Sequence, residues 1–206
     1  MRLGILVSGR GSNLEAVLDA IADGRLAAVE AALVIANRSG IRALEVAARH
    51  GVPWRVMPSA DFPSLDARDD AVGRALSEAA CDLALLAGYD QLLRPAYFAS
   101  YAGRTINIHP SLLPDHGGRG MVGLAVHAAV LAAGERETGV TIHDVTADLD
   151  AGPVILQVRV LVPGGASAPE LAEHVLGVEH QALLEVLERL SGSMTAASPA
   201  PIRARR

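Results

Sequence analysis

Short apolar runs alternate with amphipathic segments over the first half of the chain. Five runs built mainly of Val, Ile, Leu and Ala predict strands at residues 3–7, 29–36, 52–57, 83–87 and 105–109. Segments whose apolar residues recur at intervals of three and four predict helices at residues 14–22, 41–50, 65–79 and 92–101. Strands that alternate with helices in this way indicate a parallel sheet joined by right-handed crossovers.

The pattern changes in the second half of the chain. A helix is predicted at residues 123–133, but two strands then follow in succession, at 139–145 and 154–162. The polar loop between them is short enough for antiparallel pairing, so we expect the C-terminal part of the sheet to be mixed. A long amphipathic helix is predicted at 169–190. The fold class is therefore α/β, with helices flanking a mostly parallel, twisted sheet.

Composition bounds the number of domains. A chain of 206 residues is long enough for one domain with a sizeable core, which we expect at residues 1–190. Half of the residues are hydrophobic but only 3% are aromatic, so the core must be mainly aliphatic. From residue 191 to residue 206 the composition turns to Ser, Ala, Pro and Arg, which predicts a disordered tail.

Charge and cysteine content restrict the partners and the compartment. The net charge of −5 argues against a general nucleic-acid-binding surface, which is normally basic. Cys81 is the only cysteine, so no intramolecular disulfide can form, which fits a reducing compartment. No apolar run has the length of a membrane span, and the first strand is not preceded by a signal peptide. We expect a cytoplasmic protein that acts on small molecules and binds neither nucleic acid nor membranes.

The loop at residues 8–13, Ser-Gly-Arg-Gly-Ser-Asn, joins the first strand to its helix and is a candidate anion site. Glycine turns before a helix expose unpaired peptide N–H groups. A dinucleotide fingerprint would need a third glycine where Leu14 stands, and a Walker loop would need a lysine, of which the chain has none. The simpler alternative is a tight turn in which Ser12 and Glu15 form a capping box. A monophosphate site formed by the amides of Gly11 to Asn13 and the Ser12 hydroxyl fits best.

A second polar set follows the fifth strand. Asn107 and His109 are two residues apart, so both side chains face the same side of that strand. Asp150, in a turn that continues Ala-Gly-Pro, can present a carboxylate to them, although such a residue is also a common turn former. A carboxylate beside His109 is expected to raise its pKa, so that it can donate a proton near neutrality. No metal site is predicted, since the other histidines have no metal-ligand spacing: His50, His116, His127, His143, His174 and His180.

Three segments in this order resemble one enzyme family: residues 8–14, residues 107–114 (Asn-Ile-His-Pro-Ser-Leu-Leu-Pro) and residues 148–153 (Asp-Leu-Asp-Ala-Gly-Pro). Together they resemble the phosphoribosylglycinamide formyltransferases, and the likeness covers about residues 2–190. The resemblance implies a Rossmann-like formyltransferase fold. It also implies transfer of a formyl group from the co-substrate 10-formyltetrahydrofolate to the amine of glycinamide ribonucleotide, in de novo purine biosynthesis.

The resemblance also implies roles for individual residues. Asn107, His109 and Asp150 would be the catalytic set: His109 would donate a proton, Asn107 would help to stabilise the oxyanion, and Asp150 would raise the pKa of His109. The substrate amine would attack the formyl carbon directly, without a covalent enzyme intermediate. Glycinamide ribonucleotide would be bound by Gly11, Ser12, Asn13 and Glu179, the last of these at the ribose hydroxyls. The folate would be bound by Asp90, Gln91, Leu92, Leu93 and Asn107, mainly through backbone and apolar contacts.

Three positions depart from the family pattern. Family members often have an arginine where Gln91 stands and another basic residue where Leu65 stands. Arg68, one turn further along the predicted helix, is a candidate replacement. The loop at residues 115–122 is glycine-rich and about five residues longer than in the shorter family form.

Two other functions compete with formyl transfer. The first is hydrolysis of 10-formyltetrahydrofolate, with water as the acceptor. The second is a non-catalytic nucleotide-binding module built on the loop at residues 8–13. Monomer and homodimer are both compatible with the sequence.

Overall fold

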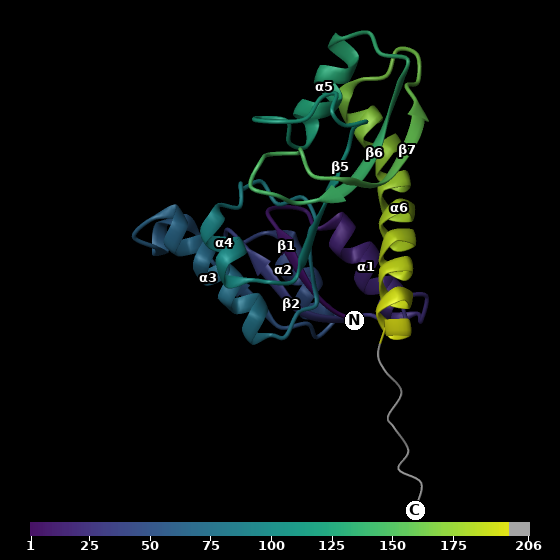
Figure 1. Ribbon diagram of the computed structural model, residues 1–206. Helices are drawn as coiled ribbons and strands as arrows, with labels where there is room; N and C mark the ends of the chain where they lie inside the picture. Colours follow the sequence, from purple (N-terminus) through teal and green to yellow (C-terminus); the bar gives the residue numbers. More distant parts are fainter. Residues whose placement is uncertain (198–206) are drawn as a thin grey trace, which may run out of the picture.

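A seven-stranded sheet runs through the computed structural model, which describes residues 1–197 (Figure 1). The strand order is β3-β2-β1-β4-β5-β6-β7. The strands are β1 (Arg2–Val7), β2 (Glu30–Ala36), β3 (Trp54–Val56), β4 (Leu83–Leu86), β5 (Arg104–His109), β6 (Glu137–Asp144) and β7 (Val154–Leu161). Strands β1 to β5 pair in parallel, whereas β6 pairs antiparallel with both β5 and β7. The expected mostly parallel sheet with antiparallel C-terminal strands is confirmed.

Helices cover both faces of this sheet. They are α1 (Ser12–Ala22), α2 (Arg42–Arg49), α3 (Leu65–Glu78), α4 (Pro95–Ser100), α5 (Leu124–Ala132) and α6 (Ala168–Ala197), with a short 3-10 helix, η1, at Ser59–Asp61. Apolar side chains of α1, α2 and α6 form one buried cluster with the sheet, which includes Ile5 of β1. Those of α3 and α4 form a second cluster with Leu6. Because successive strand residues point to opposite faces, the two clusters lie on opposite sides of the sheet.

The burial of the strands explains why their sequences are informative. The central strand β1 is covered on both faces, and Ile5, Leu6 and Val7 are completely buried. A strand in that position must be apolar throughout. The edge strand β7 alternates instead, and only Val160 of its eight residues is fully buried.

The last helix is longer than its sequence pattern predicts. The pattern predicts an end at Leu190, but α6 continues to Ala197. The hydroxyl of Ser193 donates hydrogen bonds to carbonyl groups one turn earlier, which is compatible with a helical backbone. No proline interrupts the helix before Pro199. Residues 198–206 of the expected tail lie outside the described residues.

The sheet topology determines where a ligand can bind. Strands β2 and β3 lie on one side of β1, and β4 to β7 lie on the other. The strand order therefore reverses between β1 and β4: β2 and β3 are added on one side of β1, and the later strands on the other. In open α/β sheets, ligands bind beyond the carboxyl ends of the strands at such a point.

Candidate functional site

A cleft of about 500 Å³ opens at the carboxyl ends of β1, β4 and β5. Its rim carries apolar side chains that are about half exposed: Leu92, Val122, Leu124 and Leu149. Every residue assigned to a site in the sequence lines this cleft: Gly11, Ser12, Asn13, Asp90, Gln91, Leu92, Leu93, Asn107, His109, Asp150 and Glu179. The fold thus brings together residues that are up to 168 positions apart in the chain (Gly11 to Glu179).

The loop after β1 turns into α1 at a glycine in a left-handed conformation. Gly11 has φ 74°, and a Cβ at this position would lie 2.7 Å from the Cβ of Ala43. The helix then begins at Ser12, and because residues 11–13 line the cleft, its N-terminal end lies beside it. The alternative of a capping box is wrong, because no side chain caps the helix and Glu15 pairs instead with Arg42 and Arg49 of α2. The start of the helix is left available to an external anion.

A buried carboxylate lies beside this loop. Asn13 Nδ2 donates a hydrogen bond of 2.7 Å to Glu179 Oε2 of α6, and both residues are less than 10% exposed. Burial raises the pKa of Glu179 above its usual value of 4.5, against the opposing effects of Asn13 and Arg10. Asn13 Oδ1 is buried and has no hydrogen-bond partner among residues 1–197. This pair therefore has unused capacity to bind a polar ligand.

The polar pair of β5 lies at the end of the strand. His109 is 4% exposed, and its Nε2 lies 2.9 Å from the carbonyl oxygen of His116. Its Nδ1 lies 4.0 Å from Asp150 Oδ2. That separation is too long for a hydrogen bond, but a single bridging water can span it. The backbone N–H of Gly118 donates to the same carboxylate oxygen at 2.8 Å.

A second histidine, missed in the sequence, completes this set. His143 of β6 pairs directly with Asn107 across the two strands, and its Nε2 lies 3.1 Å from Asn107 Nδ2. The same Nε2 is 3.7 Å from Asp150 Oδ1. Asp150 therefore lies between two imidazoles. No local sequence signal marked His143, which lies beside Asn107 because β6 pairs antiparallel with β5.

Burial has a larger effect on the pKa of His109 than the carboxylate of Asp150 has. Desolvation is the largest influence and holds the pKa of the His109 imidazole below its usual value of 6.5. The carbonyl of His116 and the carboxylate of Asp150 both raise that pKa, but together they do not compensate for burial. The expected net increase in the pKa is therefore wrong. The side chain is 5% exposed, which explains why removal from water outweighs a charge 4.0 Å away.

The loop between β4 and α4, residues 87–94, forms another wall of the cleft through residues 87–93. Asp90 is tied to the ends of β1 and β2, because its N–H donates to Ser8 Oγ at 3.0 Å and its Oδ1 accepts from Asn37 Nδ2 at 2.7 Å. Hydrogen bonds with Gln91, Ser8 and Asn37 and the ion pair with Arg38 keep the pKa of Asp90 below its usual value despite burial. Leu92 is exposed at the rim, whereas Leu93 is buried.

Arg68 does not replace the missing cations of this region. Its side chain is 1% exposed and forms an ion pair with Asp69, so it cannot extend to a ligand in the cleft. Its Nη1 donates instead to Gln91 Oε1 at 2.9 Å. The hypothesis of Arg68 as a surface substitute for a basic residue at position 65 is therefore wrong. The sequence periodicity did not reveal that this charged residue faces inward.

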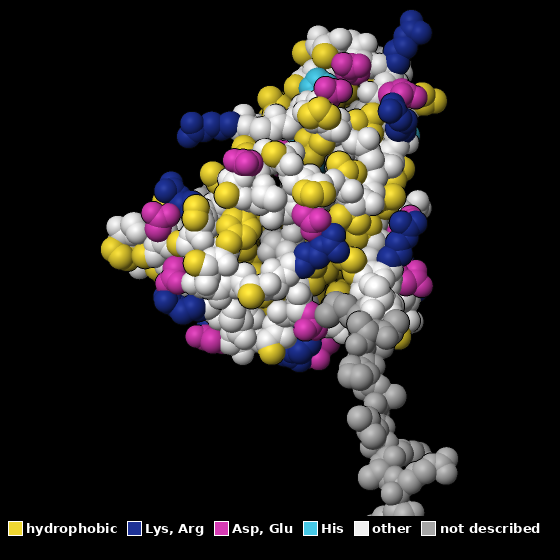
Figure 2. Space-filling model, viewed as in Figure 1, with side chains coloured by type: hydrophobic (Ala, Val, Ile, Leu, Met, Phe, Trp, Pro, Cys, Tyr) yellow, Lys and Arg dark blue, Asp and Glu magenta, His cyan; other side chains and the backbone are white. Residues whose placement is uncertain are grey.

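Metal and membrane signatures are absent from the part of the chain that is described. Among residues 1–197, no cluster of His, Cys, Asp and Glu side chains has an arrangement that could hold a metal ion. Within the same residues, no helix combines the length and apolarity needed to cross a bilayer. On the face drawn in Figure 2, acidic and arginine side chains are interspersed around the margin and form no broad basic patch.

Comparison with known proteins gives the class of enzyme to which this fold and cleft belong. The family model for formyl transferases matches residues 1–187, so the chain belongs to that family. The phosphoribosylglycinamide formyltransferase of Escherichia coli (strain K12) is 37% identical over 180 residues, which cover 87% of this chain and 82% of that protein. Within the formyl transferases, the chain is thus a member of the phosphoribosylglycinamide formyltransferases.

Solved structures and longer relatives agree with this assignment. A glycinamide ribonucleotide transformylase from Symbiobacterium toebii superimposes with a TM-score of 0.87 at 37% identity, covering 94% of this chain and 88% of that one. One from Geobacillus kaustophilus gives a TM-score of 0.85 at 38% identity, covering 93% and 98%. The trifunctional purine biosynthetic protein adenosine-3 of Drosophila pseudoobscura pseudoobscura is 38% identical over 92% of this chain. The chain spans only 14% of that longer protein.

Proposed function

We propose that this protein transfers the formyl group of 10-formyltetrahydrofolate to the amine of N1-(5-phosphoribosyl)glycinamide, in de novo purine biosynthesis. The observation that carries the proposal is the convergence of Asn107, His109 and Asp150 in one cleft with an uncapped helix start. Family membership supports the same reaction. The products are the N-formyl ribonucleotide and tetrahydrofolate.

The ribonucleotide binds at the α1 end of the cleft. Its phosphate accepts hydrogen bonds from the peptide N–H groups of Gly11, Ser12 and Asn13 and from the Ser12 hydroxyl. A helix start attracts an anion because its N–H groups and its dipole both favour negative charge. Glu179 binds the ribose hydroxyls, which can also donate to the unpartnered Asn13 Oδ1. This arrangement directs the substrate amine toward the end of β5.

The folate lies along the loop of Asp90, Gln91, Leu92 and Leu93 and reaches Asn107 with its formyl group. The peptide N–H groups of Gln91, Leu92 and Leu93 have no hydrogen-bond partner in the described part of the chain. They therefore offer donors to a polar heterocycle. The exposed Leu92 and Leu149 at the rim provide apolar surface for its aromatic part.

The reaction needs stabilisation of an oxyanion and movement of one proton. As the amine nitrogen bonds to the formyl carbon, the Asn107 amide and the His109 ring donate hydrogen bonds to the oxygen that becomes negative. When the bond from that carbon to the folate nitrogen breaks, His109 donates a proton to the leaving nitrogen. A base, in the end solvent, takes the proton lost by the amine, and Asp150 stabilises the charged imidazole through water across 4.0 Å. No covalent bond to the enzyme forms.

We further propose that the enzyme works in the cytoplasm on small molecules alone, as a monomer or homodimer. The formal charge of −5 supports partners other than nucleic acid. Hydrolysis of the folate is the competing activity, with water in place of the amine.

The test is formylation by the purified protein with both substrates at saturation, followed by product identification. We expect formylated ribonucleotide, and formate release without the ribonucleotide should be slow by comparison. His109→Ala should lower kcat by about 10²- to 10⁴-fold, as for other general acids. The matched control is His174→Ala, an exposed histidine of α6. Absence of product from the wild type, or equal turnover of the two variants, would overturn the proposal.

A further inference from the structure

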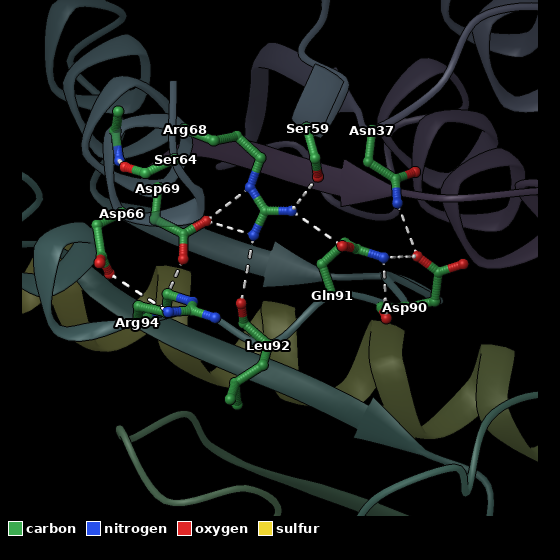
Figure 3. A network of polar contacts seen from close by, with 11 residues as sticks. Asn37, Ser59, Ser64, Asp66, Arg68, Asp69, Asp90, Gln91, Leu92 and Arg94 are labelled. Carbon is green, nitrogen blue, oxygen red and sulfur yellow. Dashed lines mark hydrogen bonds and ion pairs between the residues drawn. The ribbon is translucent and has the colours of Figure 1, made fainter. Parts of the chain in front are cut away.

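A buried ion pair lies directly behind the loop that we assign to the folate. Arg68 and Asp69 are neighbours on α3, and their side chains are 1% and 0% exposed. Two nitrogens of the guanidinium, Nε and Nη2, donate to the same oxygen, Asp69 Oδ1, the former at 2.8 Å (Figure 3). This geometry leaves Nη1 of Arg68 and Oδ2 of Asp69 available to other partners.

Both remaining groups bind the loop. Arg68 Nη1 donates to Gln91 Oε1 at 2.9 Å, and Nη2 makes a longer contact of 3.4 Å with the carbonyl of Leu92. Asp69 Oδ2 accepts from the backbone N–H of Arg94 at 2.9 Å. The ion pair therefore contacts three positions of a four-residue stretch. Within residues 1–197, one further side-chain hydrogen bond of Arg68, to Ser59 Oγ at 3.1 Å, is directed elsewhere.

Stability alone is a poor explanation for this pair. Removing two charges from water costs about as much as their mutual attraction returns, and apolar residues of similar size often serve as well or better. What an apolar pair cannot do is hold polar atoms of a loop in fixed positions. Between Asp90 and Arg94 the loop has little apolar anchoring, because Leu92 is 48% exposed and Leu93 alone of these residues is inserted into the core.

The loop is held from its other side as well. Asp90 is bonded to Ser8 and Asn37, at the ends of β1 and β2. The Gln91 side chain links the two anchors, because its Nε2 donates to Asp90 Oδ1 at 2.8 Å while its Oε1 accepts from Arg68. The unpartnered N–H groups of residues 91–93 lie between these anchors. Their direction is thus determined by hydrogen bonds on both sides.

We infer that Arg68 and Asp69 are positioning residues for the folate: they orient the Gln91–Leu93 backbone so that its N–H groups meet the heterocycle. The inference rests on the proposed function, since it assigns this loop to the folate. The pair does not touch the ribonucleotide end of the cleft, so its loss should weaken one substrate and not the other.

The principal variant is the double replacement Arg68→Met with Asp69→Asn. It removes both charges together, so no unpaired charge stays buried, and the Asn side chain can still accept from Arg94. We expect KM for 10-formyltetrahydrofolate to rise by about tenfold, which is the effect of losing one hydrogen bond to a charged group. KM for the ribonucleotide should stay within about twofold of the wild type. The matched control is Arg74→Met, which removes an exposed arginine that pairs with Asp70 on the same helix.

A second variant separates positioning from stability. In Arg68→Lys the ammonium can pair with Asp69 but lacks the planar fork needed to reach Gln91 and Leu92 as well. We expect its Tm to be closer to that of the wild type than the Tm of the double variant, with KM for the folate still raised. If the double variant does not fold, this variant alone decides the question.

The outcomes are distinct. Three results would each overturn the inference. The first is an unchanged KM for the folate in both variants, and the second is a parallel rise of the KM values for both substrates. The third is recovery of both KM and Tm to wild-type values in Arg68→Lys. Calorimetric titration with tetrahydrofolate provides a measurement independent of turnover. If the wild type binds tetrahydrofolate, the variants bind it more weakly and no product forms in any of them, the proposed function fails but the positioning role stands.

Discussion

Replacing Asp150 with asparagine tests the electrostatic part of the site while preserving its shape. The side chain keeps an oxygen that can accept the 2.8 Å hydrogen bond from Gly118. Asparagine also tolerates the left-handed backbone of this position, where φ is 51°. The variant should therefore fold normally and lose only the negative charge that faces His109 and His143.

The size of the effect follows from the geometry. At 4.0 Å a carboxylate and an imidazolium attract each other by about 4 kcal/mol at an effective dielectric constant of about 20, and by about 1 kcal/mol in water. Both side chains are at most 10% exposed, so the interaction lies toward the larger figure. With a tenfold change in rate for about 1.4 kcal/mol, kcat should fall by about 10²- to 10³-fold. KM values for both substrates should change little, because the charge acts only once His109 is protonated.

The pH profile of kcat provides a second readout. If protonated His109 donates a proton, kcat falls as pH rises through the pKa of the imidazole. Asp150 acts to raise that pKa, so its removal should shift the falling limb to lower pH. Asp115→Asn is the matched control, since it removes an exposed carboxylate from the neighbouring loop without touching the cleft. A kcat within about threefold of the wild type, or an unshifted profile, would refute the electrostatic role of Asp150.

Three further predictions concern stability. Glu179→Gln replaces a buried carboxylate that resists ionisation with a neutral group that still accepts a hydrogen bond from Asn13. It should increase the free energy of unfolding near neutral pH and raise KM for the ribonucleotide. Thermal unfolding and steady-state kinetics measure the two effects. The Ser64 hydroxyl caps the start of α3, where it accepts a hydrogen bond from the N–H of Ala67 at 3.1 Å. Ser64→Ala should therefore lower the free energy of unfolding by about 1 kcal/mol, measured with denaturant, without altering kcat. Acid should destabilise the protein, because several of its imidazoles have a lower pKa in the folded chain than in the unfolded chain. At pH values between those two pKa values, the unfolded chain binds more protons than the folded chain. The free energy of unfolding should therefore decrease as pH falls below about 6.5. Glu179→Gln is the best protein for this measurement, because it lacks the carboxylate whose pH dependence has the opposite sign. Unchanged stability between about pH 7.5 and about pH 5.5 would contradict this prediction. The groups responsible are three imidazoles whose pKa is lowered mainly by burial: His109, His127 and His180.

The parallel half of the sheet could be predicted closely because its strands are buried on both faces. A run such as Leu3 to Val7 has no alternative role in a chain of this composition, and the predicted bounds differ from the observed ones by at most two residues for each parallel strand. The antiparallel strands and their pairing with each other were predicted as well, but the pairing of β6 with β5 was not. The neighbour of β5 is β6, and sequence alone did not select it.

The site was predictable only where short motifs carry chemistry. Asn107 and His109 stand at the end of β5 just before a proline, Asp150 stands in a turn, and all three line one cleft as expected. His143 lies within an ordinary strand, and Arg68 within an ordinary helix, so neither has a local signal. Their importance comes from what packs against them. The pKa of His109 depends on the same kind of information, since its sign is decided by burial that only the folded chain provides.

The topology explains why the proposed chemistry and the proposed substrate sites have different structural origins. Parallel strands β1 and β4 end in loops, and these loops supply backbone N–H groups that can bind substrates. Backbone groups bind but do not titrate, so they cannot move a proton. The titratable side chains come from the end of β5 and from the antiparallel strand β6 with its following turn, which cross the same edge of the sheet. Antiparallel pairing places His143 directly opposite Asn107 and returns the chain so that Asp150 lies within 4.0 Å of both imidazoles. A sheet that remained parallel throughout would carry the chain away from this edge through a crossover, and would leave His109 buried without a nearby carboxylate.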